Sequence, residues 1–439
     1  MRLHWLLALV LSLPAPGFAG ETGPGAATEG SSPRARQDLP LPPGVRSRAE
    51  RVAFQAAQAT PGQSAAGVGE RVPGPPGSGG WLELEYTVDP ELDRRVRQVL
   101  ARGGIALGHV ILLDAESGEV LSYVSTAPET FPPTRTYPTA SLMKVVTAAA
   151  VLRNRPEAAQ RDCRYVGSPY RVLKSNLVAP ASGGRAESFW RALALSNNQC
   201  FARLAVHDLG KPALLAEMKH VGLLEAPAAR HPPGQVLPIG SELELGYLGS
   251  GLGGSFVTPL GAARLAAVLA AGRLVQPYWV GRVRDAHGNT LATPGRQAPR
   301  RAWPVPVADE LRELMVAVTE RGTARSAFRD GRGHPLLGGI RVSGKTGTLS
   351  GDDPKGVYHW FIGVAPADAP RVAVASVVVN ARSGSAAEVA ARSLHALLCR
   401  GQVCDTTRVD ALRARAVERD AGIVAEILAQ QRAARGEPG

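Results

Sequence analysis

One segment of the sequence places a serine and a lysine in a run that is otherwise apolar on nearly every side. From Ser141 the chain reads Ser-Leu-Met-Lys-Val-Val-Thr-Ala-Ala-Ala-Val-Leu, and Pro138 lies just upstream, where a helix is expected to begin. A helix that is apolar all round has to be buried. Ser141 and Lys144 are three residues apart and therefore share one face of this helix. The fold must enclose a hydroxyl and an amine together.

Burial gives this pair a chemical meaning. Desolvation lowers the pKa of an amine, so Lys144 can be neutral and accept the proton of the Ser141 hydroxyl. The first turn of the helix also presents free backbone N–H groups to a developing oxyanion. The alternative is a capping serine beside a lysine that extends to solvent, and an isolated Ser-x-x-Lys favours that alternative.

The composition favours the chemical interpretation. The chain has 50 lysines and arginines, of which only six are lysines, at positions 144, 174, 211, 219, 345 and 355. A chain that otherwise uses arginine for positive charge has lysine at both Lys144 and Lys345. Arginine stays protonated and could not act where a proton must be given up.

Two further motifs complete a set. Ser196-Asn197-Asn198 forms a polar break between apolar stretches that extend over 189–205; it is either a simple turn or a loop that projects Ser196 and Asn198 toward a cleft. Lys345-Thr346-Gly347-Thr348 follows an expected strand and would present a cation and hydroxyls to a substrate carboxylate. Gly347 leaves room for a peptide backbone, and an edge strand here could pair with an extended peptide. The three motifs together supply what a serine acyl transfer needs.

In this combination the chain resembles the penicillin-binding transpeptidase domain, a group of serine acyltransferases related to the serine β-lactamases. The resemblance covers about residues 81 to 400. The motif spacings fit, with 55 residues from Ser141 to Ser196 and 149 from Ser196 to Lys345. Other segments also resemble that domain: the lead-in over 84–93, the first hairpin over 108–122, and the Val-Thr-Pro-Leu segment over 256–267.

The resemblance implies a role for each motif residue. Ser141 is the nucleophile that attacks D-Ala-D-Ala stem peptides, and Lys144 is its base. Ser196 relays the proton to the departing D-alanine, and Lys345 positions this relay. Asn198, Thr346, Gly347 and Thr348 bind the substrate, and the backbone N–H groups of Ser141 and Thr348 form the oxyanion hole. Penicillins are expected to acylate Ser141. No cofactor and no metal ion is expected.

The expected enzyme is a serine D,D-transpeptidase, and two alternatives use the same acylation site. The residues around Ser141 lack the Pro-Gly and Lys-Pro that usually flank a transpeptidase nucleophile and look locally like a D,D-carboxypeptidase. A β-lactamase needs a base aimed at water; the nearest Glu-x-x-Leu-Asn-like string, at 242–246, ends in Gly246 and reads as part of a helix before 249–254. A β-lactam sensor would need a transmembrane segment, and a non-catalytic wall-binding scaffold would not need intact motifs.

The chain ends point to export. Residues 1–19 read as a signal peptide, with an apolar core over 6–13 too short to span a bilayer and a small-x-small site at 17–19. Residues 20–80 are rich in Gly, Ala, Pro and Ser and are expected to be a disordered tether. The periplasm or cell envelope is the expected location, with no transmembrane segment after cleavage. A tether this short leaves no room for a glycosyltransferase domain, so a separate glycosyltransferase is a candidate partner.

The remaining pattern predicts an α+β fold, in which helices flank an antiparallel sheet and an all-helical lobe forms the active-site cleft with it. The catalytic domain is expected over 81–404 and a charged helical tail over 405–439, from Thr407 to about Ala434, which is either a packing helix or a partner contact. Strands are expected at 109–114, 119–125, 340–346, 358–364 and 371–380. Helices are expected at 141–153, 188–206, 260–271, 308–320 and 385–398.

Cysteines and charge add two expectations. Four cysteines in an exported chain suggest disulfides, with Cys163 paired to Cys200 and Cys399 to Cys404. A Cys-x4-Cys metal half-site is disfavoured because no second pair of ligands accompanies it. The formal charge of +12 comes from scattered arginines without interleaved aromatics, so no nucleic-acid partner is expected; attraction to anionic wall polymer or membrane, or simple compositional drift, explains it.

Overall fold

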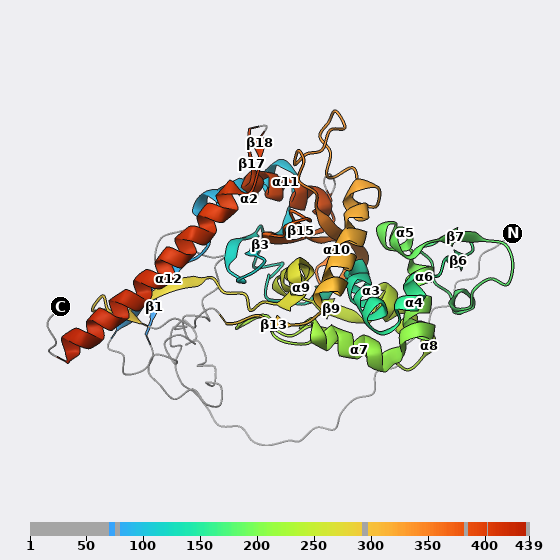
Figure 1. Ribbon diagram of the computed structural model, residues 1–439, viewed down its shortest axis with the longest axis horizontal. Coiled ribbons are helices and arrows are strands. Elements are labelled where there is room, and N and C mark those ends of the chain that lie inside the picture. The colour runs from blue at the N-terminus through green and yellow to red at the C-terminus, as the bar shows by residue number, and fades with distance from the viewer. Residues whose placement is uncertain (1–69, 75–79, 292–296, 382–384, 402, 436–439) are drawn as a thin grey trace, which may run out of the picture. The chain divides into compact units, whose positions relative to one another are not determined.

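A five-stranded antiparallel sheet forms the centre of the computed structural model, which describes residues 70–74, 80–291, 297–381, 385–401 and 403–435 (Figure 1). The strand order is β14-β15-β16-β3-β4, so β14 and β4 are the edges. The predicted α+β fold with an antiparallel sheet is confirmed. The strands are β3 (Leu107–Asp114), β4 (Val120–Ser125), β14 (Ser343–Asp352), β15 (Lys355–Ala365) and β16 (Val372–Val379).

Alternate residues of β3 serve two separate hydrophobic cores, as the two-residue period of a strand dictates. Ile111 and Leu113 belong to the core that contains α9 (Pro259–Ala271), whereas Val110 and Leu112 belong to the core that contains α2 (Pro90–Arg102) and α11 (Ala386–Leu398). Both faces of the sheet are therefore covered by helices. This explains why β16 is buried at every position and reads as a continuous apolar run.

The second lobe is built around α3 (Met143–Asn154), in which ten residues are buried. Helix α10 (Val305–Glu320) runs between this lobe and β14. The lobe is not purely helical as predicted, because the ribbon of β6 (Cys163–Tyr165) and β7 (Arg185–Glu187) also belongs to it. Its other helices are α4 (Pro156–Ala159), α5 (Phe189–Ala194), α6 (Asn198–Arg203), η3 (Leu204–Leu209), α7 (Gly210–His220) and α8 (Glu242–Ser250), with the short helix η2 (Lys174–Leu177).

Most predicted elements of the catalytic domain are confirmed within a few residues, but one strand differs. The strand expected over 340–346 is β14, which begins at Ser343 and continues to Asp352. Its second half is polar and partly exposed, and it is held by pairing with β15, in which Leu349 lies opposite Tyr358. The polar break predicted at Ser196-Asn197-Asn198 is confirmed, because it divides the helical segment expected over 188–206 into α5 and α6. The remaining short strands are β5 (Tyr137–Pro138), β8 (Gln235–Val236), β9 (Ser255–Val257), β10 (Arg273–Leu274), β11 (Val280–Arg284), β12 (Thr290–Leu291), β13 (Arg300–Arg301), β17 (Cys399–Arg400) and β18 (Val403–Cys404).

The end of the predicted tether is folded. Residues 70–73, assigned to the tether from their composition, form β1 (Glu70–Pro73), which pairs with β2 (Trp81–Tyr86) in a sheet of order β1-β2-β11-β12. The composition of residues 70–73 gives no strand signal. They form a strand because their backbone groups pair with β2, in which buried residues alternate with less buried ones. The predicted signal peptide and the tether up to residue 69 lie outside the described residues.

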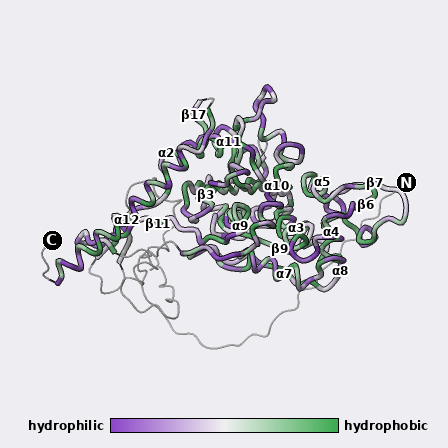
Figure 2. The backbone as a smooth tube through the Cα atoms, viewed as in Figure 1, coloured by the Kyte–Doolittle hydropathy of each residue, from purple (hydrophilic) through white to green (hydrophobic). Residues whose placement is uncertain are grey.

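The predicted tail helix is α12 (Thr407–Ala434), and it belongs to the same compact unit as the sheet. Arginines attach it: Arg408 contacts Asp89 at 2.9 Å, and Arg419 contacts Glu119 at 2.9 Å. In Figure 2 this helix alternates between hydrophilic and hydrophobic colour. The described part of α12 is therefore a packing helix, although its outer face still exposes Val417, Val424 and Leu428.

Both predicted disulfides are present, Cys163–Cys200 and Cys399–Cys404. Among the described helices, none is long and apolar enough to cross a membrane.

Candidate active site

Ser141 and Lys144 meet at the start of the buried helix, as the three-residue spacing requires. Ser141 lies in the short helix η1 (Ala140–Leu142), and Lys144 lies in the first turn of α3, which continues it. The distance between Lys144 Nζ and Ser141 Oγ is 2.9 Å. Lys144 is completely buried, whereas Ser141 is half-buried. The amine is thus shielded from water while the hydroxyl next to it remains accessible.

The surroundings of Lys144 favour the neutral amine. Its Nζ also lies 2.5 Å from Asn198 Oδ1 and contacts the backbone carbonyl of Ser250. Burial first, and the charge of Lys345 second, hold the pKa of Lys144 well below its ordinary value. A neutral amine has two N–H donors and one lone pair; with the donors directed to Asn198 and Ser250, the lone pair faces the Ser141 hydroxyl. This is the arrangement that a general base requires.

A second amine–hydroxyl pair lies beside the first. Lys345 Nζ donates to Ser196 Oγ at 3.0 Å and to the backbone carbonyl of Thr346 at 2.9 Å. Lys345 is completely buried, and burial lowers its pKa to about 7. Ser196 occupies the break between α5 and α6 with a positive φ of 60°, a conformation that non-glycine residues adopt only when the surroundings enforce it.

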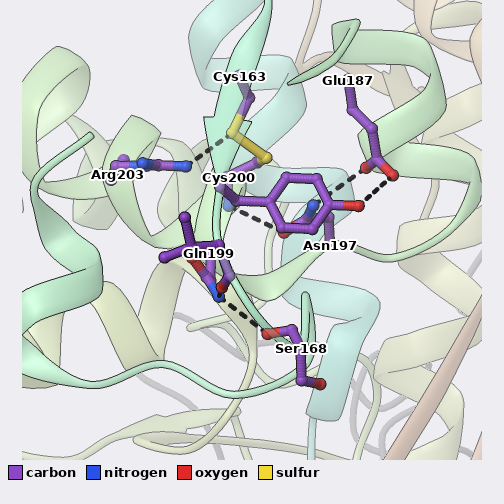
Figure 3. Close-up of a disulfide and its surroundings, with 9 residues drawn as sticks. Cys163, Ser168, Glu187, Asn197, Gln199, Cys200 and Arg203 are labelled. Carbon is purple, nitrogen blue, oxygen red and sulfur yellow. Dashed lines mark hydrogen bonds between the residues drawn. A yellow bond between two sulfur atoms is a disulfide. The ribbon is translucent and has the colours of Figure 1, made fainter. Parts of the chain in front are cut away.

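The loop that carries Ser196 is fixed by polar contacts and a disulfide (Figure 3). Asn197 caps α6 by accepting from the Cys200 backbone N–H, and its amide donates to Glu187 Oε2 at 3.0 Å. The Cys163–Cys200 disulfide joins α6 to the β6–β7 ribbon, in which Tyr165 donates to the same Glu187 carboxylate. The predicted Cys163–Cys200 disulfide therefore helps to hold the loop that carries Ser196 in place.

Asn198 connects Lys144 to the segment between β6 and η2. Its Oδ1 accepts from Lys144, and its Nδ2 donates to the Tyr170 carbonyl at 2.8 Å. One N–H of this amide therefore has a protein partner, and one is left for a ligand. Its role in holding a donor peptide stays a prediction.

The third motif, 345–348, lies in the edge strand β14 beside Ser141. A Cβ atom at Gly347 would lie 3.1 Å from the Ala140 Cβ and 3.4 Å from the Ser141 backbone N, so this position tolerates only a very small residue. Thr346 is half-buried and Thr348 is exposed. Contact between β14 and η1 brings the backbone of both elements to the Ser141 hydroxyl, where the oxyanion hole is expected.

The structure thus brings together Ser141, Lys144, Ser196, Asn198, Lys345, Thr346, Gly347 and Thr348, where the helical lobe meets the β14 edge. Sequence reasoning missed several neighbours. Thr323, which follows α10, places its Oγ1 2.5 Å from that of Thr346, and Gly251, which ends α8, lies against the Ala140 carbonyl. The glycine-rich string 249–254 was a signal for the second of these, whereas nothing in the sequence marked Thr323.

Carboxylates are not part of this network. Among the described residues, no Asp or Glu accepts a hydrogen bond from Lys144 or Lys345. Glu242 and Glu244, in the string considered as a possible deacylation base, lie in the first turn of α8, where Glu244 accepts from the Gly240 backbone N–H at 2.7 Å. Lys144 instead contacts Ser250, at the opposite end of that helix.

Comparisons with known proteins agree with this geometry. The family model of the penicillin binding protein transpeptidase domain matches residues 108–398. The peptidoglycan D,D-transpeptidase PbpA of Mycobacterium tuberculosis is 28% identical over 344 residues, which cover 68% of this chain and 67% of that protein. The crystal structure of PBPA from M. tuberculosis superposes with a TM-score of 0.59 at 26% identity, covering 71% of this chain and 80% of that one. Its penicillin G acyl-enzyme complex gives a TM-score of 0.56 at 26% identity, covering 71% and 79%.

Proposed function

Because the chain belongs to the family of penicillin-binding protein transpeptidase domains, we propose that it is a serine D,D-transpeptidase that acts on D-Ala-D-Ala stem peptides of peptidoglycan. The observation that carries the proposal is the pair of buried amines, each on its own hydroxyl: Lys144 on Ser141 and Lys345 on Ser196. Relatives named peptidoglycan D,D-transpeptidase support the substrate class.

Acylation of Ser141 follows from these contacts. The Ser141 Oγ attacks the carbonyl carbon of the penultimate D-alanine while its proton passes to the neutral amine of Lys144. A C–O bond forms, the carbonyl oxygen becomes an oxyanion near the η1 and β14 backbone N–H groups, and the tetrahedral intermediate then expels the terminal D-alanine. Ser196, held by Lys345, donates its proton to the leaving amine as the C–N bond breaks, and it recovers a proton from the protonated Lys144, which becomes neutral again.

The second half-reaction transfers the acyl group. The amine of an acceptor stem peptide attacks the Ser141 ester, a new amide bond forms, and the Ser141 oxygen recovers its proton. Thr346 and Thr348 are assigned to the substrate carboxylate, Asn198 to the donor amide, and the close approach at Gly347 admits the peptide backbone. The free edge of β14 supplies the backbone groups that an extended donor strand needs.

A β-lactam presents a strained amide to the same nucleophile, and its leaving group stays tethered after ring opening. A β-lactamase needs a base that activates water for hydrolysis of the adduct. Among the described residues, no carboxylate accepts a hydrogen bond from Lys144 or Lys345, which supports a long-lived adduct over rapid hydrolysis. We therefore expect β-lactams to be covalent inhibitors rather than substrates.

The proposed place of action is the periplasm or cell envelope, where the substrate is found. The two disulfides support this location, because disulfides persist in oxidising compartments. We propose that crosslinking uses glycan strands supplied by a separate glycosyltransferase.

The test is the intact mass of the full chain incubated for hours with benzylpenicillin, beside Ser141→Ala and Lys144→Arg. A long-lived adduct in the wild type, absent in Ser141→Ala and strongly slowed in Lys144→Arg, supports the acylation chemistry. Lys144→Arg separates charge from basicity, because arginine cannot give up its proton. Rapid loss of the adduct with destruction of the drug would instead mean a β-lactamase, and no adduct on a folded chain would leave a scaffold.

The fate of the acyl group needs a second measurement. The enzyme is incubated with a D-Ala-D-Ala pentapeptide donor and an amine acceptor of the stem-peptide type, and products are separated by mass. A crosslinked product supports the transpeptidase, whereas a trimmed tetrapeptide alone, at saturating acceptor, would assign a D,D-carboxypeptidase.

A further inference from the structure

Three metal-ligand side chains meet at the end of α11, on an element that the proposed reaction does not use. His395, Cys399 and Cys404 have ligand atoms that all lie within 4.8 Å of one another. Among the described residues, this is the one group of three or more His, Cys, Asp or Glu with such spacing. In the structure the two cysteines form a disulfide.

The local fold explains the convergence. His395 lies in the last turn of α11, and Cys399 follows this turn as the extended residue that ends the helix and begins β17. The chain then turns at Gly401, whose φ is +64°, and Cys404 returns directly opposite Cys399 in the β17–β18 ribbon. The sequence disfavours a metal half-site at Cys399 and Cys404 because no second pair of ligands accompanies it; the structure adds one further ligand, His395.

We propose that reduction of the Cys399–Cys404 disulfide converts this cluster into a binding site for a soft divalent metal ion, of which Zn²⁺ is the representative. The disulfide takes two electrons and two protons from a dithiol, which becomes a disulfide itself. The two thiols then lose their protons as the metal binds, so the complex holds two thiolates and the neutral imidazole of His395.

The donor set and its charges fit this ion. Two thiolates and one imidazole are ligands that zinc prefers and that hard cations such as Mg²⁺ do not. Burial first, and Arg392 second, lower the pKa of His395, which favours the neutral ring that a metal requires. The two thiolate charges balance the ion, so that Arg392 faces a neutral complex.

A fourth position is open toward solvent. His395 and Cys399 line a cavity of about 790 Å³ between α2 and α11. Its wall also carries Arg94, Arg102 and Arg392. An exchangeable ligand, either water or a small anion attracted by these arginines, is therefore expected in the fourth position of a tetrahedral site.

The other disulfide is an internal control. Cys200 is buried in the lobe core, and Arg203 Nη2 lies 2.9 Å from Cys163 Sγ. Among the described residues, no third His, Cys, Asp or Glu forms a cluster of metal-ligand spacing with these two cysteines. Reduction of Cys163–Cys200 should therefore create no comparable site.

The experiment titrates Co²⁺ and then Zn²⁺ into the full chain, oxidised and after reduction with the phosphine reductant removed, in an oxygen-free solution. The reduced chain should bind one Co²⁺ with thiolate-to-cobalt charge-transfer absorption, which Zn²⁺ abolishes; the oxidised chain should not. His395→Ala should weaken binding by about tenfold or more. His287→Ala, which changes an exposed histidine in a distant turn, should leave affinity unchanged.

A second readout avoids reliance on cysteine variants that fail to fold. Zn²⁺ should slow the alkylation of Cys404, which is half-exposed, in the reduced wild type but not in reduced His395→Ala, with far-ultraviolet circular dichroism showing both to be folded. The proposal is overturned if the reduced wild type shows no thiolate–cobalt band, if His395→Ala binds as tightly as His287→Ala, or if Zn²⁺ leaves Cys404 alkylation unchanged.

Discussion

The approach of Gly251 to the nucleophile offers a sensitive test of how the site is positioned. Gly251 ends α8 with a φ of +74°. A Cβ added there would lie 2.1 Å from the Ala140 carbonyl oxygen and 2.9 Å from the Ser141 Cα. Gly251→Ala therefore displaces the peptide that carries Ser141, the proposed nucleophile, without removing any side chain assigned to catalysis.

The size of the effect can be worked from these contacts. Real Cβ atoms essentially never come closer than 3.0 Å to another heavy atom, so against the 2.1 Å at Ala140 the two backbones must separate by 0.9 Å. A misplacement of about 1 Å costs an enzyme on the order of 10²-fold in rate, which is about 2.7 kcal/mol in activation free energy. The left-handed φ adds about 1 kcal/mol of strain to the folded state.

The assay is the second-order rate of acylation by a fluorescent penicillin, with urea unfolding measured in parallel. Two glycines provide controls: a Cβ at Gly253 meets nothing within 4 Å, whereas one at Gly272, with φ +64°, lies 2.4 Å from the Trp303 carbonyl oxygen. Gly253→Ala should change neither quantity, and Gly272→Ala should lower stability alone. Acylation of Gly251→Ala at the wild-type rate, or a loss no greater than that of Gly272→Ala, would refute the reasoning.

Two further predictions concern buried charge. Because Lys345 helps to lower the pKa of Lys144, Lys345→Met should move the acidic limb of the acylation pH profile to higher pH, besides slowing acylation by about 10² or more. Burial lowers the pKa of Lys345 from 10.5 to about 7, so the unfolded chain binds more protons between these values and stability rises with pH across that window. Unfolding of Lys345→Met at several pH values should show a smaller rise, because burial still holds the pKa of Lys144 low in this variant. Arg419→Ala removes the ion pair of the buried Glu119 carboxylate, which keeps the hydrogen bond from Tyr278, and should cost about 3 kcal/mol in urea unfolding. Arg415→Ala, whose side chain is 65% exposed, should cost less than about 1 kcal/mol.

The parts of the fold that the sequence predicts are those in which local pattern and burial agree. Helix α3 is apolar all round and lies in the core, and β16 is a continuous apolar run covered on both faces. The contact of Lys144 with Ser141 is also local, because the two residues are three positions apart along continuous helical segments. The burial of α3 and β16 and the contact between Ser141 and Lys144 can all be predicted from the spacing of apolar and polar residues along the sequence.

The parts that it misses depend on partners far along the chain. The second half of β14 is polar, and only its register with β15 makes it a strand. Likewise β1 has the composition of a tether and is ordered by β2. In both segments tertiary pairing overrides a weak local preference.

The active site combines both situations. Each motif could be recognised from its own residues, but the contact of Lys345 with Ser196 spans 149 positions, and the groups that fix its geometry are backbone atoms. Lys144 and Asn198 are oriented by the backbone carbonyls of Ser250 and Tyr170. Because every residue has such a carbonyl, these contacts cannot be recognised in a sequence. What does leave a mark is the space they need. Position 251 requires glycine because its backbone has a positive φ and because the Ala140 carbonyl lies where a Cβ atom would be. The glycine at this position is therefore a sign in the sequence of how the backbone around Ser141 is packed.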